Sequence, residues 1–95
     1  MANRNTYVPT HTRVKARRIR KVMKAILPAH PESDAEADEM EADLKLLYGL
    51  FPNYDIEFVD LLGDNHSFEL SHNISEFEAL EVKYIKAPEL ASKML

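Results

Sequence analysis

Basic side chains gather in one short stretch of the sequence, where their spacing could create a surface that binds anions. Residues 13–24 contain seven basic residues and no acidic one. On a helix, four of the seven would lie within about 60° of one another, and a fifth would lie beside them. Guanidinium groups can bind phosphate or carboxylate oxygens through two hydrogen bonds at once. We therefore predict an anion-binding or nucleic-acid-binding ridge made of Arg13, Arg17, Arg20, Lys21 and Lys24.

The acidic residues gather in the segment that follows. Residues 32–43 contain seven acids and no base. The charge is +8 over residues 1–31 and −12 over the remainder, which together give the net charge of −4. Such asymmetry indicates an ionic partner, inside the chain or outside it. Acidic residues in the first turn of a helix are stabilised by the positive end of the helix dipole. The acidic residues further along this segment lie beyond that first turn, so the dipole does not account for them. We therefore predict an alternative partner-binding site, in which carboxylates imitate the phosphates of a nucleic acid. Its residues are Asp38, Glu39, Glu41 and Asp43.

The sequence leaves two interpretations of the basic ridge open. Like charges three or four residues apart each cost a helix about 0.2–0.5 kcal/mol, so five such pairs cost roughly 1–2.5 kcal/mol. Either the acidic segment relieves this repulsion within the chain, or an external anion relieves it. Exposed ion pairs contribute only about 0–1 kcal/mol each, although a network of them would still set the register of two helices.

The sequence contains no motif typical of a catalytic site or of a metal-binding site. It contains no cysteine, and therefore no disulfide, thiolate metal site or cysteine nucleophile. On a regular strand, His66 and His72 would lie roughly 20 Å apart, too far to share one metal ion. No serine has the context of a nucleophile elbow, and there is no glycine-rich phosphate loop. We predict a protein that is not an enzyme and that uses no cofactor or metal.

The apolar content and the length of the sequence give expectations for the localisation of the protein and for its number of domains. Residues 1–5 lack the apolar core of a signal peptide, and no apolar run is long enough to cross a membrane. We therefore expect a soluble, cytoplasmic protein with no membrane partner. The 95 residues suffice for one modest core. We predict an extended arm over residues 1–11 and a single domain over residues 12–95.

Two amphipathic helices are predicted in the N-terminal half of the chain. Thr12 can cap the first helix, and Pro28 ends it because proline lacks the N–H group. Ser33 and Glu36 have the spacing of a capping box at the start of the second helix, which Gly49 ends. The short connection favours an antiparallel helical hairpin. The apolar stripe of the first helix consists of Val14, Ile19, Val22, Met23, Ile26 and Leu27.

Alternation of apolar and polar residues predicts strands in the C-terminal half. Residues 54–58 and 67–71 alternate in this way on either side of a turn at residues 63–65, which predicts a hairpin. Residues 75–86 are predicted to form a short helical turn and then a third strand, and Pro88 begins a tail that could form a short helix. The predicted fold class is α+β, with an N-terminal antiparallel helical hairpin packed on a small three-stranded antiparallel sheet.

These features predict a small, non-catalytic binding or regulatory protein that docks on nucleic acid or on an acidic protein surface through its basic helix. One alternative is an inhibitor or adaptor whose acidic helix binds a nucleic-acid-handling protein. A second alternative is a structural or assembly subunit that self-associates through the charged helices, for example as a homodimer. The negative net charge favours protein partners, because it repels polyanions.

Overall fold

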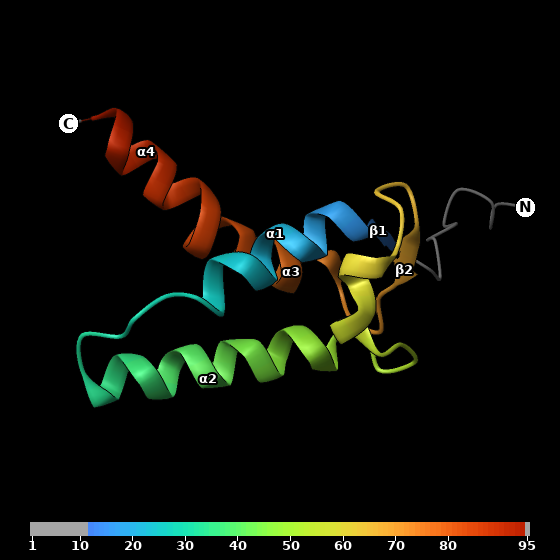
Figure 1. The fold of residues 1–95 in the computed structure, drawn as a ribbon, viewed down its shortest axis with the longest axis horizontal. Helices are drawn as coiled ribbons and strands as arrows, with labels where there is room; N and C mark the ends of the chain where they lie inside the picture. Colours follow the sequence, from blue (N-terminus) through green and yellow to red (C-terminus); the bar gives the residue numbers. More distant parts are fainter. Residues whose placement is uncertain (1–11, 95) are drawn as a thin grey trace, which may run out of the picture.

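The computed structural model describes residues 12–94, which form a mostly helical fold with one small sheet (Figure 1). The predicted arm at residues 1–11 lies outside the described residues. Two short 3₁₀ and π-helical segments, η2 and η3, connect the longer elements. In chain order the elements are β1 (Arg13–Lys15), α1 (Ala16–Ile26), α2 (Asp34–Gly49), η2 (Ile56–Leu61), β2 (Ser67–Glu69), α3 (Ile74–Glu81), η3 (Val82–Lys86) and α4 (Ala87–Lys93).

The three-stranded sheet predicted from the sequence is wrong. Within residues 12–94 the sheet has two strands, β1 and β2, which pair antiparallel with Val14 opposite Phe68. The helix predicted from Thr12 therefore begins only at Ala16. Val14 is buried, as its place in the apolar stripe requires, but it lies on a strand. Alternate side chains of a strand reach the core as readily as one face of a helix does.

Residues 56–61 form the 3₁₀ helix η2 in place of the first predicted strand. Asp55 caps this helix, because its side chain accepts a hydrogen bond of 3.2 Å from the backbone N–H of Glu57. Ile56 and Val59 are buried, whereas Phe58 is exposed. A spacing of three residues places two side chains on the same side of a 3₁₀ helix. The apolar pattern here therefore has a period of three, and the predicted hairpin with residues 67–71 does not form.

The third predicted strand is also wrong, because residues 74–93 form one continuous helical segment, α3–η3–α4, which we call the C-terminal helical segment. Its cap is Asn73, which accepts a hydrogen bond of 3.1 Å from the N–H of Ser75. Within η3 the helix widens, and the N–H of Ala87 bonds to the carbonyl of Val82. Pro88 explains this wider turn, because it donates no hydrogen bond and its ring crowds the preceding turn. The predicted short C-terminal helix is present as α4.

The predicted N-terminal helical hairpin does not fit the structure either. The chain enters α1 from a strand, and α1 packs more closely against η2 and η3 than against α2. Residues 27–33, which include Pro28 and Pro31, lead the chain outward before α2 begins (Figure 1). The start and end of α2 are as predicted: Ser33 accepts a hydrogen bond of 3.1 Å from the N–H of Glu36, and the helix ends at Gly49. No residue in the first half of α2 is buried.

The core lies where α1, the end of α2, β2 and α3 meet. Phe51 stands at its centre, with its ring 6.2 Å from that of Phe68 and 6.1 Å from that of Phe77, both in edge-to-face contact. This packing turns one face of α1 inward and leaves its cationic edge at the surface. As predicted, that buried face contains Ile19, Val22, Met23 and Ile26, but Leu27 is exposed.

Candidate functional site

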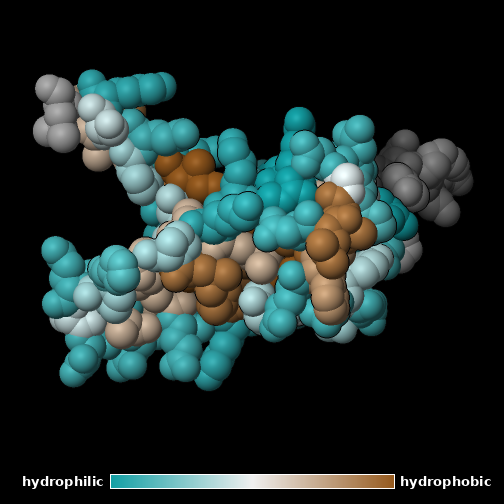
Figure 2. Space-filling model, in the orientation of Figure 1, coloured by the Kyte–Doolittle hydropathy of each residue, from teal (hydrophilic) through white to brown (hydrophobic). Residues whose placement is uncertain are grey.

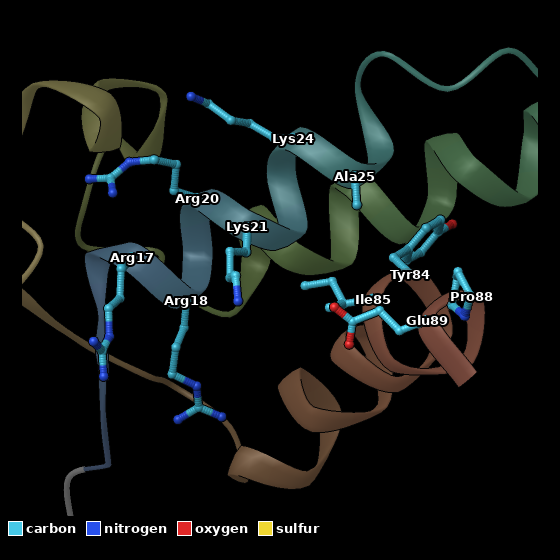
Figure 3. A pocket seen from close by; sticks show the side chains of 10 residues that line it. All are labelled: Arg17, Arg18, Arg20, Lys21, Lys24, Ala25, Tyr84, Ile85, Pro88 and Glu89. Carbon is cyan, nitrogen blue, oxygen red and sulfur yellow. The ribbon is translucent and has the colours of Figure 1, made fainter. Parts of the chain in front are cut away.

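A groove of about 880 Å³ runs between α1 and the C-terminal helical segment, and we call it the basic groove (Figure 3). One wall is the cationic edge of α1, and the other is the region where η3 continues into α4. Four of the five predicted ridge residues line the groove, and Arg13 does not. The lining residues are Arg17, Arg18, Arg20, Lys21, Lys24 and Ala25 on one side and Tyr84, Ile85, Pro88 and Glu89 on the other.

Arg20 is a structural residue, although the sequence placed it in the ridge. Its Nη1 lies 2.6 Å from Oδ1 of Asp64, and its Nε lies 3.2 Å from Oδ1 of Asp60. Its Nη2 also donates to the carbonyl oxygens of Val59 and Leu62 at 3.2 and 3.1 Å. Figure 3 shows the side chain pointing away from the opposite wall of the groove. Arg20 therefore ties η2 and the following loop to α1, and its donors are used within the chain.

Arg18 is likewise held within the chain, by a carboxylate on α3. Its Nε and Nη2 donate to the two carboxylate oxygens of Glu81 at 3.0 and 2.7 Å, and its guanidinium lies 5.3 Å from the ring centre of Phe77. The side chain of Glu81 is only 11% exposed. The hydrogen bond to Glu81 raises the pKa of Arg18, so the guanidinium stays charged. This bidentate ion pair links α1 to α3, and Arg18 also lines the groove.

The cations that remain accessible on α1 are Arg17, Lys21 and Lys24, all of them exposed. Among residues 12–94, Arg17 and Lys21 make no ion pair, while Lys24 lies 3.5 Å from Asp60. Figure 3 shows Lys21 extending into the space between the walls, on the side of Ile85. Arg13 is exposed on β1, outside the groove. The predicted five-residue ridge is therefore reduced to three exposed cations on α1, of which Lys21 extends into the groove and Lys24 points away from the opposite wall (Figure 3).

The opposite wall of the groove is largely apolar. Tyr84, Ile85 and Pro88 line it, and Glu89 supplies one carboxylate. Figure 2 shows apolar surface at the root of α4, next to the hydrophilic surface of α1. Beyond the groove, α4 has no buried residue, and Leu90 is 60% exposed. Pro88 both lines the groove and follows directly after the wider turn of η3.

Two of the four predicted acidic site residues are engaged within the chain. Glu39 and Asp43 both pair with Lys83 of the C-terminal helical segment, and Lys83 Nζ lies 2.6 Å from Oδ2 of Asp43. The hydroxyl group of Tyr84 donates to the same Asp43 oxygen at 2.6 Å. This network, which we call the Lys83 cluster, joins α2 to η3.

The other two predicted acidic residues, Asp38 and Glu41, are exposed on another side of α2. They line a second hollow beside Leu27, and Glu41 also lies 4.0 Å from Lys45. The phosphate-mimicking surface proposed for α2 is therefore split between two sides of the helix. Its four carboxylates do not form one continuous patch.

We expect the Lys83 cluster to make the fold sensitive to alkali. Burial and the hydrogen bond to Asp43 raise the pKa of Tyr84 to about 12. Hydrogen bonds to Asp43 and Glu39 raise the pKa of Lys83. Both shifts favour the protonated form in the fold, so the stabilisation is complete below the ordinary pKa values of 10.0 and 10.5. It is lost as the pH rises from there through the folded pKa values.

The measurement is the free energy of unfolding in urea between pH 8 and pH 12. Wild type should lose more stability above about pH 10 than Tyr84→Phe, which has no phenolic proton to release. Equal losses in the two proteins would show that Tyr84 does not contribute to the alkaline sensitivity.

Sequence reasoning missed the residues that organise this site. Arg18 was counted among the basic residues but not assigned a role. Asp60 and Asp64 were interpreted only as turn residues, and Glu81 and Lys83 only as part of a strand. Their partners lie 40 or more residues away along the chain. Neither spacing nor composition reveals such pairs, because they exist only once the elements are packed.

Neither a cluster of metal ligands nor a membrane-spanning helix is present in the described part of the chain. Within residues 12–94, no group of three or more His, Asp or Glu side chains could hold a metal ion. In the same range, no helix combines the length and the apolar character needed to span a membrane. Comparison with protein-family models, curated proteins and solved structures finds no match to this chain.

Proposed function

We propose that the protein is a non-catalytic binding protein that docks an acidic segment of a protein partner in the basic groove. The observation that supports this function best is the pairing of two unlike walls. Lys21 extends into the groove from one wall, on a helix that also exposes Arg17 and Lys24, and Ile85 and Pro88 offer apolar surface on the other wall (Figure 3). A helix with one acidic edge and one apolar edge complements both walls at once, in the helix-in-groove mode of recognition.

Protein suits the groove better than nucleic acid for two reasons. First, the internal pairing of Arg18 and Arg20 leaves three accessible cations, which is a small number for gripping a phosphate backbone. Second, a uniformly charged strand would have to lie against apolar side chains and against the carboxylate of Glu89. An amphipathic helix avoids both penalties, because its carboxylates occupy only one edge.

The test is the affinity of the protein for an acidic amphipathic peptide of about 18 residues, with glutamates on one edge and leucines beside them. Lys21→Glu should weaken binding about tenfold, because it reverses a charge that faces the groove. Binding to the wild type should also weaken as salt is added, because exposed charges are screened. Fluorescence anisotropy of the labelled peptide measures both effects.

The matched control is Lys93→Glu, the same charge reversal on an exposed lysine of α4 outside the groove. It should leave the affinity for the peptide unchanged. A labelled single-stranded oligonucleotide of equal charge distinguishes the other class of partner. Tighter binding of the oligonucleotide, or equal losses in Lys21→Glu and Lys93→Glu, would overturn the proposed function.

A further inference from the structure

The chain carries an acidic edge that repeats the spacing of its own accessible cations. Asp34, Asp38 and Glu41 are separated by four and three residues on α2, and all three are exposed. Arg17, Lys21 and Lys24 on α1 have the same separations. In both helices these steps span about 10.5 Å along the axis, and each set lies within about 60° around the helix. Two such edges match charge for charge when the helices run parallel.

The two edges do not meet within one molecule. Asp38 and Glu41 face the hollow beside Leu27, whereas Lys21 extends toward the C-terminal helical segment and Lys24 lies 3.5 Å from Asp60 (Figure 3). Among residues 12–94, no ion pair joins α1 to α2. Within residues 12–94, each edge has one member with an oppositely charged neighbour, Lys24 beside Asp60 and Glu41 beside Lys45, and the like charges of its other members still repel one another. A contact between copies would relieve the repulsion on both edges.

The surface beside the acidic edge also suits a groove with one apolar wall. Ala35 and Ala42 are exposed on α2 next to Asp38. Their small side chains allow a second helix or a groove wall to approach closely, and they expose no polar group to Ile85 and Pro88. No residue in the first half of α2 is buried in its own core, so this half is accessible to another molecule.

We propose that the acidic partner of the basic groove is a second copy of this chain, whose α2 helix docks by its edge of Asp34, Asp38 and Glu41. This inference rests on the proposed function and names its partner. Arg17, Lys21 and Lys24 of one copy face Asp34, Asp38 and Glu41 of the next, in that order. The contact joins two different surfaces, so it continues from copy to copy and builds a ring or an open chain.

The test is the molar mass in solution, measured by light scattering at about 0.02 M and about 0.5 M NaCl. Wild type should exceed the monomer mass at low salt and return to it at high salt. Lys21→Glu and Asp38→Lys should each be monomeric at low salt, because each places like charges face to face. The double variant Lys21→Glu/Asp38→Lys should associate again, because it restores the pair with the signs exchanged. Lys93→Glu, the matched control, should associate as wild type does.

The outcomes separate this inference from the function on which it rests. Far-UV circular dichroism first establishes that each variant is folded. A wild-type monomer at low salt would overturn self-association, and binding of the acidic peptide by that monomer would leave the proposed function standing. A wild-type monomer at low salt that also does not bind the acidic peptide would overturn both the self-association and the proposed function. A double variant that stays monomeric would overturn the stated pairing of Lys21 with Asp38.

Discussion

Replacing Phe51 by alanine is expected to lower the free energy of unfolding by about 3–5 kcal/mol, the range for truncating a large buried aromatic side chain. Phe51 is 0% exposed and contacts both Phe68 and Phe77 edge to face. Its removal leaves a cavity where the end of α2, β2 and α3 meet. Because small domains are stable by only about 5–15 kcal/mol in total, much of the stability would be lost.

Urea unfolding, followed by circular dichroism, measures this loss. The matched control is Phe58→Ala, the same chemical change at a phenylalanine that is 55% exposed. It should cost less than about 1 kcal/mol, because truncating an exposed side chain creates no cavity. Similar losses in the two variants would contradict the placement of Phe51 at the centre of the core.

Replacing Arg18 by alanine is expected to cost about 2–3 kcal/mol, somewhat below the range for a fully buried pair because the arginine is partly exposed. The carboxylate of Glu81 would lose both of its hydrogen bonds in a site where it is 11% exposed. The cost arises from leaving a desolvated charge without a partner.

Urea unfolding measures this change as well, and the chain supplies two comparisons. Arg17→Ala removes the neighbouring arginine, which makes no ion pair among residues 12–94, and should change stability by less than about 0.5 kcal/mol. The double variant Arg18→Leu/Glu81→Leu should recover most of the loss, because two apolar side chains replace the pair without a buried charge. A double variant as unstable as Arg18→Ala would show that the stability depends on packing by the arginine stem.

The basic groove also shows how far charge patterns in a sequence identify a site. The stretch of basic residues pointed to α1, and four of its five selected members line the groove. Sequence could not separate Arg20, whose donors are used by η2 and the next loop, from Lys21, which faces the groove. The two residues are adjacent in sequence and similar in charge. Only the packing of distant segments against α1 gives them different roles.

Helical periodicity and capping residues, which depend on neighbours in the sequence, predicted the two helices in the N-terminal half of the chain. The cap at Ser33 and the end of α2 at Gly49 depend on residues within a few positions of one another, and they are as predicted. The apolar stripe of the first helix is as predicted at Ile19, Val22, Met23 and Ile26, but not at Val14, which lies on β1, or at Leu27, which is exposed. The strands were wrong because their evidence was short and ambiguous. Ile56 and Val59 are three residues apart and fit one side of a 3₁₀ helix, whereas Phe58, which the alternation placed with Ile56, is exposed. The β-branched residues near Val82 lie in a continuous helix that widens before Pro88.

The sequence by itself determined where the charges lie and which residues of α1 turn inward. The tertiary structure alone decided which charges are neutralised: Arg18 by Glu81, Arg20 by Asp60 and Asp64, and Glu39 and Asp43 by Lys83. It also decided that an apolar wall stands opposite the remaining cations. The physical reason is that ion pairs and grooves depend on distances in space, whereas helical periodicity and capping depend on neighbours along the chain.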